Sequence, residues 1–183
     1  MAKKVIILLA EGFEEVEAVT PIDYLRRAGA EVTVAAIGEN LAVKGVRGIQ
    51  INAGTTLAET TAGEWDAVVL PGGMPGAEKL AASPETAALL RKTAAAGKLI
   101  CAICASPAVV LAPLGLLEGR KFTCYPGLEE KAAAGKWSDS RVVTDGNLIT
   151  SRGAGTAGEF AVAIIASLFD EETGKKIAES VLL

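Results

Sequence analysis

The sequence predicts an α/β fold in which a doubly wound, mostly parallel sheet carries helices on both faces. Short apolar segments alternate with helical segments through the first two thirds of the chain, and this alternation is typical of parallel sheets. Hydrophobic residues make up 50% of the chain but aromatic residues only 4%, so Ala, Val, Ile and Leu carry the packing, as in buried parallel strands. The 183 residues suit a single domain, residues 1–183.

The strands are predicted from short apolar runs that end at turn residues. The expected strands are Lys4–Ala10, Glu31–Ile37, a short pair within Val43–Asn52, Ala67–Leu70, the run that starts at Leu99, Lys121–Cys124, and a hairpin of Val142–Thr144 and Leu148–Ser151. The segment Thr55–Gly63 is expected to be a connector.

The helices are predicted from apolar spacing and from residues that begin or end helices. Gly29 marks the end of the first helix, and Ser83 with Pro84 marks the start of another. The expected helices are Phe13–Arg27, Ala77–Ala82, Glu85–Ala96, Ala108–Ala112, Glu129–Ala134, Ala157–Phe169 and Lys175–Leu182.

Composition excludes several classes of function. A net charge of -4 without a basic run gives no general attraction to nucleic acid or to acidic membranes. No stretch is long enough to span a membrane, and the apolar N-terminal run is cut short by Glu11, which favours a strand over a signal peptide. Three cysteines, an odd number, argue against a disulfide framework and for a reducing, cytoplasmic compartment.

The chain contains no histidine. It therefore cannot supply a Ser-His-Asp triad, a Cys-His dyad or a His-ligated metal site. We expect no metal, and any reactive group must take its proton partner from another residue type.

Cys104 is the predicted nucleophile. It follows a buried apolar run and precedes Ser106-Pro107, which reads as an N-cap and first helical residue. A sharp turn between strand and helix exposes a nucleophile on α/β scaffolds, and the start of a helix favours the thiolate. Two alternatives are a buried structural thiol and a C-x-x-C dithiol or half zinc site with Cys101. Strand alternation turns Cys101 into the core.

Gly72 and Gly73 follow the strand Ala67–Leu70, whose carboxyl end lies at the same edge of the sheet as Cys104. Glycines here serve a tight turn, and they also let backbone N–H groups approach a substrate. The N–H groups of Gly73 and Ala105 are therefore candidates for an oxyanion hole. Glu17 lies on the inward face of the first helix, where burial is expected to raise its pKa and make it the general acid or base.

Several other side chains remain candidates for anion contacts or for packing. Arg27, Arg47 and Arg152 are candidate anion ligands, and composition does not choose among them. Tyr125 and Trp137 are more typical of packing.

Five segments, in this order and spacing, resemble the ThiJ/PfpI superfamily, in particular the branch of the Parkinson's-associated protein deglycase. The similarity runs from about Lys4 to Leu182. The segments are Glu11–Glu17 with Pro21–Gly29, Val69–Gly73, Ala102–Ala105 and Thr150–Thr156.

The resemblance implies a flavodoxin-like three-layer sandwich, a homodimer and an oxidation-sensitive nucleophile at Cys104. Glu17 would be the protonated carboxyl beside it, with backbone donors from Gly72, Gly73 and Ala105. Arg47, Arg27 and Asp23 have counterparts in the family near the dimer interface and the site.

It also implies a cofactor-independent glyoxalase or deglycase, a lyase or hydrolase that acts on methylglyoxal, glyoxal or their early glycation adducts. The alternative is a redox-responsive chaperone or oxidative-stress sensor in which the same cysteine becomes sulfinic acid.

One departure concerns Tyr125. Many members of the superfamily carry a histidine near the cysteine within a Thr-His-Pro segment, whereas this chain has Thr123-Cys124-Tyr125-Pro126. The protease and amidotransferase branches need that histidine, so both activities are disfavoured. The glyoxalase interpretation remains because Glu17 can transfer the protons.

Overall fold

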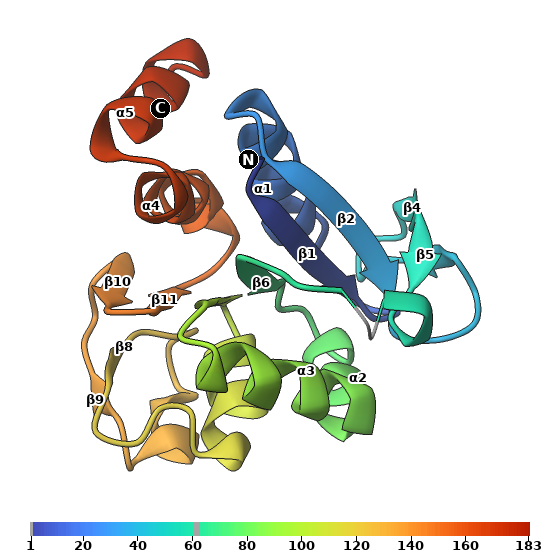
Figure 1. Ribbon diagram of the computed structural model, residues 1–183. Coiled ribbons are helices and arrows are strands. Elements are labelled where there is room, and N and C mark those ends of the chain that lie inside the picture. The colour runs from blue at the N-terminus through green and yellow to red at the C-terminus, as the bar shows by residue number, and fades with distance from the viewer. Residues whose placement is uncertain (1, 61–62) are drawn as a thin grey trace.

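The computed structural model describes residues 2–60 and 63–183, and its centre is a seven-stranded sheet (Figure 1). The strand order is β10-β11-β7-β6-β1-β2-β5. All neighbouring strands run parallel except the hairpin of β10 and β11. The sheet strands are β1 (Lys4–Leu9), β2 (Glu31–Ala36), β5 (Thr55–Thr56), β6 (Ala67–Leu70), β7 (Leu99–Ile103), β10 (Val142–Asp145) and β11 (Leu148–Ser151).

Helices cover both faces of the sheet, as the sequence predicts (Figure 1). Alternate residues of β1 point to opposite faces, so Val5, Ile7 and Leu9 join one core cluster and Ile6 and Leu8 the other. The first cluster is covered by α1 (Glu15–Arg27) and α4 (Ala157–Leu168), against which α5 (Glu171–Ser180) packs. The second is covered by α2 (Gly76–Ala82) and α3 (Pro84–Ala95).

Two small sheets lie outside the main one. An antiparallel pair, β3 (Ala42–Lys44) and β4 (Gln50–Asn52), matches the pair expected within Val43–Asn52. The other pairs β8 (Lys121–Phe122) with β9 (Lys136–Trp137) in parallel, and β9 has no counterpart among the predicted strands. Short 3₁₀ turns occur at Ala58–Thr60, Ala112–Leu114, Glu129–Ala132 and Ala154–Thr156.

The segment after β7 differs from the α-helix expected there. Pro107–Leu111 forms a π-helical turn that passes into the 3₁₀ turn, because Pro113 lacks the N–H that a continuing α-helix would need. Ser106 occupies the N-cap position before Pro107, as expected, but its side chain does not cap the turn. The Ser106 backbone is helical, and its hydroxyl makes no capping hydrogen bond. Oγ of Ser106 donates instead to the Pro71 carbonyl oxygen at 2.6 Å.

Other boundaries shift by a few residues. The expected connector Thr55–Gly63 contains β5 and a 3₁₀ turn, and its residues 61–62 lie outside the described residues. The last helix begins at Glu171 rather than Lys175, because the Asp170 carboxylate accepts a hydrogen bond from the Thr173 N–H and caps it. In the described part of the chain, no helix is both long and apolar enough to cross a bilayer.

Candidate active site

Cys104 sits at the carboxyl end of β7 in a backbone conformation that side chains seldom adopt. Its φ is +65°, in the left-handed region that costs a non-glycine residue conformational energy and recurs at functional sites. Two backbone hydrogen bonds hold it there. The Cys104 N–H donates to the Ser151 carbonyl at 2.9 Å, and the Cys104 carbonyl accepts from the Tyr125 N–H at 2.7 Å. The elbow expected from the sequence is present, and its thiol is partly exposed.

The Glu17 side chain extends from α1 to the Cys104 thiol. Its neighbour Val16 is 48% exposed whereas Glu17 is 1% exposed, so the carboxyl faces the protein interior. Oε2 of Glu17 accepts a hydrogen bond from the Gly72 N–H at 2.8 Å, and the carboxyl is hydrogen-bonded to the Cys104 thiol. The structure thus brings the Glu17 carboxyl and the Cys104 sulfur together.

Gly72 is required by this close approach. A Cβ atom at Gly72 would lie 2.7 Å from Cys104 Cβ and 2.8 Å from Oε2 of Glu17, which is closer than carbon atoms pack. The absence of a side chain at Gly72 therefore lets the loop after β6 lie against both Cys104 and Glu17.

The N–H groups of Gly73 and Ala105 both point at the Cys104 sulfur and act to lower the pKa of its thiol. Gly73 has a φ of +88°, a conformation that glycine adopts without strain. The two candidate oxyanion donors therefore converge beside the Cys104 sulfur. A negative charge on the sulfur, or on an oxygen bound next to it, would meet two hydrogen-bond donors.

Burial raises the pKa of Glu17 from its ordinary 4.5 to about 7, in the expected direction, against the lowering effect of its hydrogen bonds from Gly72 and Cys104. Burial also raises the pKa of the Cys104 thiol, to about 12, and the charge of the Glu17 carboxylate adds to the rise. The expectation that a helix start alone would favour the thiolate is therefore wrong at this site.

The two groups instead share one proton. With Glu17 ionised, its charge and its hydrogen bond hold the proton on the sulfur. With the proton on Glu17, that repulsion is gone and the carboxyl O–H can donate to the sulfur alongside the N–H groups of Gly73 and Ala105. A thiolate beside the Glu17 carboxylate is therefore disfavoured, and the first proton is lost with a pKa of about 7.

The other candidate residues divide into near and distant groups. Tyr125 is adjacent, since its N–H binds the Cys104 carbonyl, and its side chain is 52% exposed. Arg27 and Asp23 form an exposed ion pair of 2.7 Å with each other. Arg27 lies about 15 Å along α1 from Glu17 at the rise of a regular helix. Arg47 is exposed on the loop between β3 and β4, and its backbone N–H donates to Oε1 of Glu15 at 2.7 Å.

Cys101 is fully buried in β7, as strand alternation predicts, and Cys124 is fully buried as well. Arg152 is half-buried, and its Nη1 donates to the Asp139 carbonyl at 2.8 Å. Trp137 is 41% exposed rather than packed inside.

Two features of the site escaped the sequence interpretation. The hydrogen bond from Ser106 to the Pro71 carbonyl connects the elbow to the loop after β6. The sequence predicts a capping role for Ser106 and does not predict this bond. Gly153 faces both Tyr125 and Glu17. It lies within Thr150–Thr156, one of the segments that resemble the family, but no role was expected for it.

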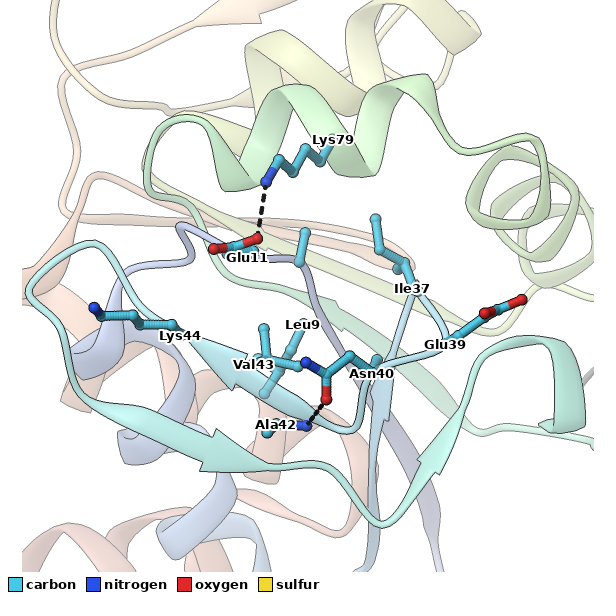
Figure 2. A pocket seen from close by; sticks show the side chains of 12 residues that line it. Leu9, Glu11, Ile37, Glu39, Asn40, Ala42, Val43, Lys44 and Lys79 are labelled. Carbon is cyan, nitrogen blue, oxygen red and sulfur yellow. Dashed lines mark hydrogen bonds and ion pairs between the residues drawn. The ribbon is translucent and has the colours of Figure 1, made fainter.

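A cavity of about 420 Å³ lies at the carboxyl ends of β1 and β2, and neither Cys104 nor Glu17 lines it (Figure 2). Its floor is apolar, and Lys79 Nζ is already 3.5 Å from Oε2 of Glu11. The side chains of Lys44 and Glu39 extend to opposite ends of it (Figure 2). This cavity offers no group for the chemistry at Cys104.

Comparison with known proteins identifies a family and several relatives to which the chain is similar. The model of the DJ-1/PfpI family matches residues 3–167. Protein DJ-1 homolog B of Arabidopsis thaliana is 43% identical over 98% of the chain, but the chain spans only 41% of that protein's length. Protein dj-1beta of Drosophila melanogaster is 42% identical, with 100% of the chain and 98% of the relative covered. A deglycase of Pyrococcus horikoshii is 35% identical over 81% of the chain and 89% of its own length.

The solved structures agree with this placement. The structure of oxidized Toxoplasma gondii DJ-1 superposes with a TM-score of 0.96 at 42% identity, covering 99% of this chain and 98% of that one. The family model covers most of the chain, and the three relatives are 35–43% identical to it over the aligned residues. The chain therefore belongs to the DJ-1/PfpI family.

Proposed function

We propose that this protein is a cofactor-independent enzyme of the glyoxalase or deglycase type that acts on methylglyoxal, glyoxal and their early glycation adducts. The observation that carries the proposal is the Cys104–Glu17 pair, a thiol on a strained turn joined to a buried carboxyl whose pKa is about 7. A relative that is 35% identical is a deglycase, which supports this class of reaction. The glyoxalase reaction and the deglycase reaction use the same Cys104 thiol and differ only in the substrate.

In the first step the Cys104 sulfur adds to the aldehyde carbon of the 2-oxoaldehyde. The C–S bond forms as the electron pair of the C=O bond moves to oxygen, and the proton shared by the pair ends on Glu17. The N–H groups of Gly73 and Ala105, which converge on the sulfur, stabilise the oxyanion. Glu17 then returns the proton to that oxygen, which gives a neutral hemithioacetal.

In the second step Glu17 moves a proton between two carbons. Its carboxylate takes the hydrogen on the former aldehyde carbon, and the electron pair of that C–H bond forms an enediolate with the neighbouring carbonyl. Glu17 returns this proton to the second carbon, while the hydroxyl proton on the first carbon moves to the oxygen of the second, so that the first carbon becomes a carbonyl. The product is a thioester of a 2-hydroxy acid. Water cleaves the C–S bond and regenerates the thiol, so that methylglyoxal and water give lactic acid with atoms and electrons balanced.

An early glycation adduct of an amine reacts through the same hemithioacetal. Cys104 displaces the amine from the hemiaminal carbon, a C–N bond breaks as the C–S bond forms, and the amine leaves with the shared proton. The resulting hemithioacetal is the one already described.

The test is lactate production from methylglyoxal without added cofactor. Protein blocked beforehand with iodoacetamide is the control, since alkylation removes the nucleophile and leaves the rest of the chain in place. We expect lactate from the unblocked protein and none above buffer from the blocked one. Equal lactate from both samples, or none from either, would reject the enzyme.

A second candidate is a redox sensor that uses the same sulfur. It is favoured because Cys104 is the one partly exposed cysteine among three free thiols, and because a DJ-1 structure with a TM-score of 0.96 is of an oxidized protein. Absence of lactate together with a gain of two oxygen atoms at Cys104 under mild peroxide would select this function.

The proposal includes a homodimer that buries the outer face of α1, in a reducing, cytoplasmic compartment. Val16 and Val19 are 48% and 47% exposed on that helix, and Ile49 is 59% exposed on the neighbouring loop. This loop is fixed to α1 by the N–H groups of Arg47 and Ile49, which donate to Oε1 of Glu15. An exposed apolar patch on a rigid surface is a typical contact between subunits, and Arg27, Asp23 and Arg47 would lie in it or at its rim.

A further inference from the structure

Ser106 holds one end of a peptide unit whose other end contacts Glu17. The Ser106 hydroxyl donates to the Pro71 carbonyl oxygen at 2.6 Å. The next N–H along the chain, that of Gly72, donates to Oε2 of Glu17 at 2.8 Å. The Pro71 carbonyl and the Gly72 N–H belong to the same planar peptide unit, in which the C=O and N–H bonds point in opposite directions. Any rotation of this unit therefore disturbs both hydrogen bonds together.

The loop after β6 needs such a hold because it contains two successive glycines. Gly72 and Gly73 have no side chains to restrict the rotation of their peptide units. The unit that follows Pro71–Gly72 is held in the same way, since the Glu14 N–H donates to the Gly72 carbonyl at 2.9 Å. Of these two donors to the loop, only Ser106 is a side chain, so it is the one that a substitution can remove.

Both ends of the Pro71–Gly72 unit lie inside the protein. Ser106 is 0% exposed, and Pro71 and Gly72 are buried. Without the hydroxyl the buried Pro71 carbonyl would lose this donor, which leaves the orientation of the unit less favourable. A hydrogen bond at one end of a peptide unit also polarises the unit and strengthens the bond at its other end. The hydroxyl therefore orients the Gly72 N–H and makes it a better donor.

We propose that Ser106 is a positioning residue whose hydroxyl fixes the Pro71–Gly72 peptide unit so that the Gly72 N–H points at the Glu17 carboxylate. The inference rests on the proposed function, in which Glu17 carries the proton, and it adds the group that stabilises the charged form of this carboxyl. Ser106 acts through the backbone of the loop and not on the substrate.

The proposal has a consequence for the charge of Glu17. Burial raises the pKa of Glu17 most, the hydrogen bonds from Gly72 and Cys104 lower it, and the charge of Glu14 raises it. Among the described residues, Cys104 and Glu14 are the titratable groups that act on this carboxyl, and Ser106→Ala changes neither. Poorer alignment of the Gly72 N–H should therefore raise the pKa of Glu17, because a hydrogen bond to a carboxylate is stronger than one to a neutral carboxyl.

The test is the rate of Cys104 alkylation by iodoacetamide in Ser106→Ala between pH 5 and pH 10. We expect the apparent pKa at which the rate levels off to rise by about one unit, the effect of weakening a hydrogen bond to a charged group. Below pH 6 the rate should stay within about twofold of the wild type. The fully protonated pair and the pair with the charge on sulfur both carry a neutral Glu17 carboxyl, so the loss affects them equally.

A purely structural role predicts a different curve. If Ser106→Ala only loosened the elbow and exposed the thiol, the rate would change by the same factor at every pH. The matched control is Thr93→Val, which removes another buried hydroxyl, one that donates to the Leu89 carbonyl at 2.8 Å within α3. This control should keep the wild-type profile. A uniform change in Ser106→Ala, an unchanged pKa, or an equal shift in Thr93→Val would overturn the inference.

A second measurement follows Glu17 itself. The infrared band of its protonated carboxyl, identified by its absence in Glu17→Gln, should persist to a pH about one unit higher in Ser106→Ala than in the wild type. Neither measurement needs turnover. Absence of lactate would therefore reject the proposed enzyme and leave this inference to be decided by the two titrations. Equal midpoints of the infrared band in Ser106→Ala and the wild type would contradict it.

Discussion

Glu17→Gln is expected to lower kcat/KM for methylglyoxal by about 10³-fold, within the range of a lost general acid or base. Glutamine keeps an oxygen that accepts the Gly72 N–H, which Oε2 of Glu17 now binds at 2.8 Å, so the loop stays in place. It cannot take the proton from the thiol or carry one between two substrate carbons. The loss should therefore appear in kcat, measured as lactate formed at saturating substrate.

The control is Glu31→Gln, which removes an exposed carboxylate at the start of β2 and should keep the wild-type rate. A Glu17→Gln enzyme within fivefold of the wild type would show that another group moves the protons. Titration of the free thiol in each variant checks that Cys104 is present and reduced.

The stability of the protein should fall by about 3 kcal/mol between pH 4.5 and pH 8 because of Glu17 alone. Burial raises its pKa from 4.5 to about 7, so the folded state binds the proton more tightly than the unfolded state does. The stabilisation is present in full below pH 4.5 and is lost as the pH rises through 7, where a buried carboxylate must form. Urea unfolding at several pH values measures the slope.

The glutamine side chain in Glu17→Gln does not ionise. The free energy of unfolding of this variant should therefore not show the part of the decline with pH that comes from Glu17. At pH 8 its free energy of unfolding should exceed that of the wild type by more than any difference at pH 4.5. Parallel curves for the two proteins across this range would mean that Glu17 ionises in the folded state as it does in the unfolded state.

Local residue patterns were enough to predict the sheet and the elbow. Strands β1, β6 and β7 are short apolar runs, and buried parallel strands of this kind have few alternatives. Cys104 could be placed on the elbow because one apolar run ends there before Ser106-Pro107. Glu17 could be selected because it falls on the buried face of its helix, where it is 1% exposed.

The remaining features depend on contacts between distant segments. Ser106 was expected to cap a helix, but its hydroxyl finds the Pro71 carbonyl, which only the fold brings near. The protonation of Cys104 follows from burial and from a carboxyl 87 residues earlier in the chain, and local sequence contains neither. The pairing of β9 with β8 rests on two residues in each strand, too few for a periodic pattern.

The central claim is that Cys104 and Glu17 together lose one proton near pH 7 and that the reactive sulfur exists in this singly charged pair. The direct measurement is the rate of alkylation by iodoacetamide between pH 5 and pH 10. Cys101 and Cys124 are fully buried, so the reaction reports Cys104. The rate should rise tenfold per pH unit at low pH and level off above an apparent pKa of about 7. A rate that continues to climb tenfold per unit through pH 9, or one that is already constant at pH 5, would contradict the shared proton.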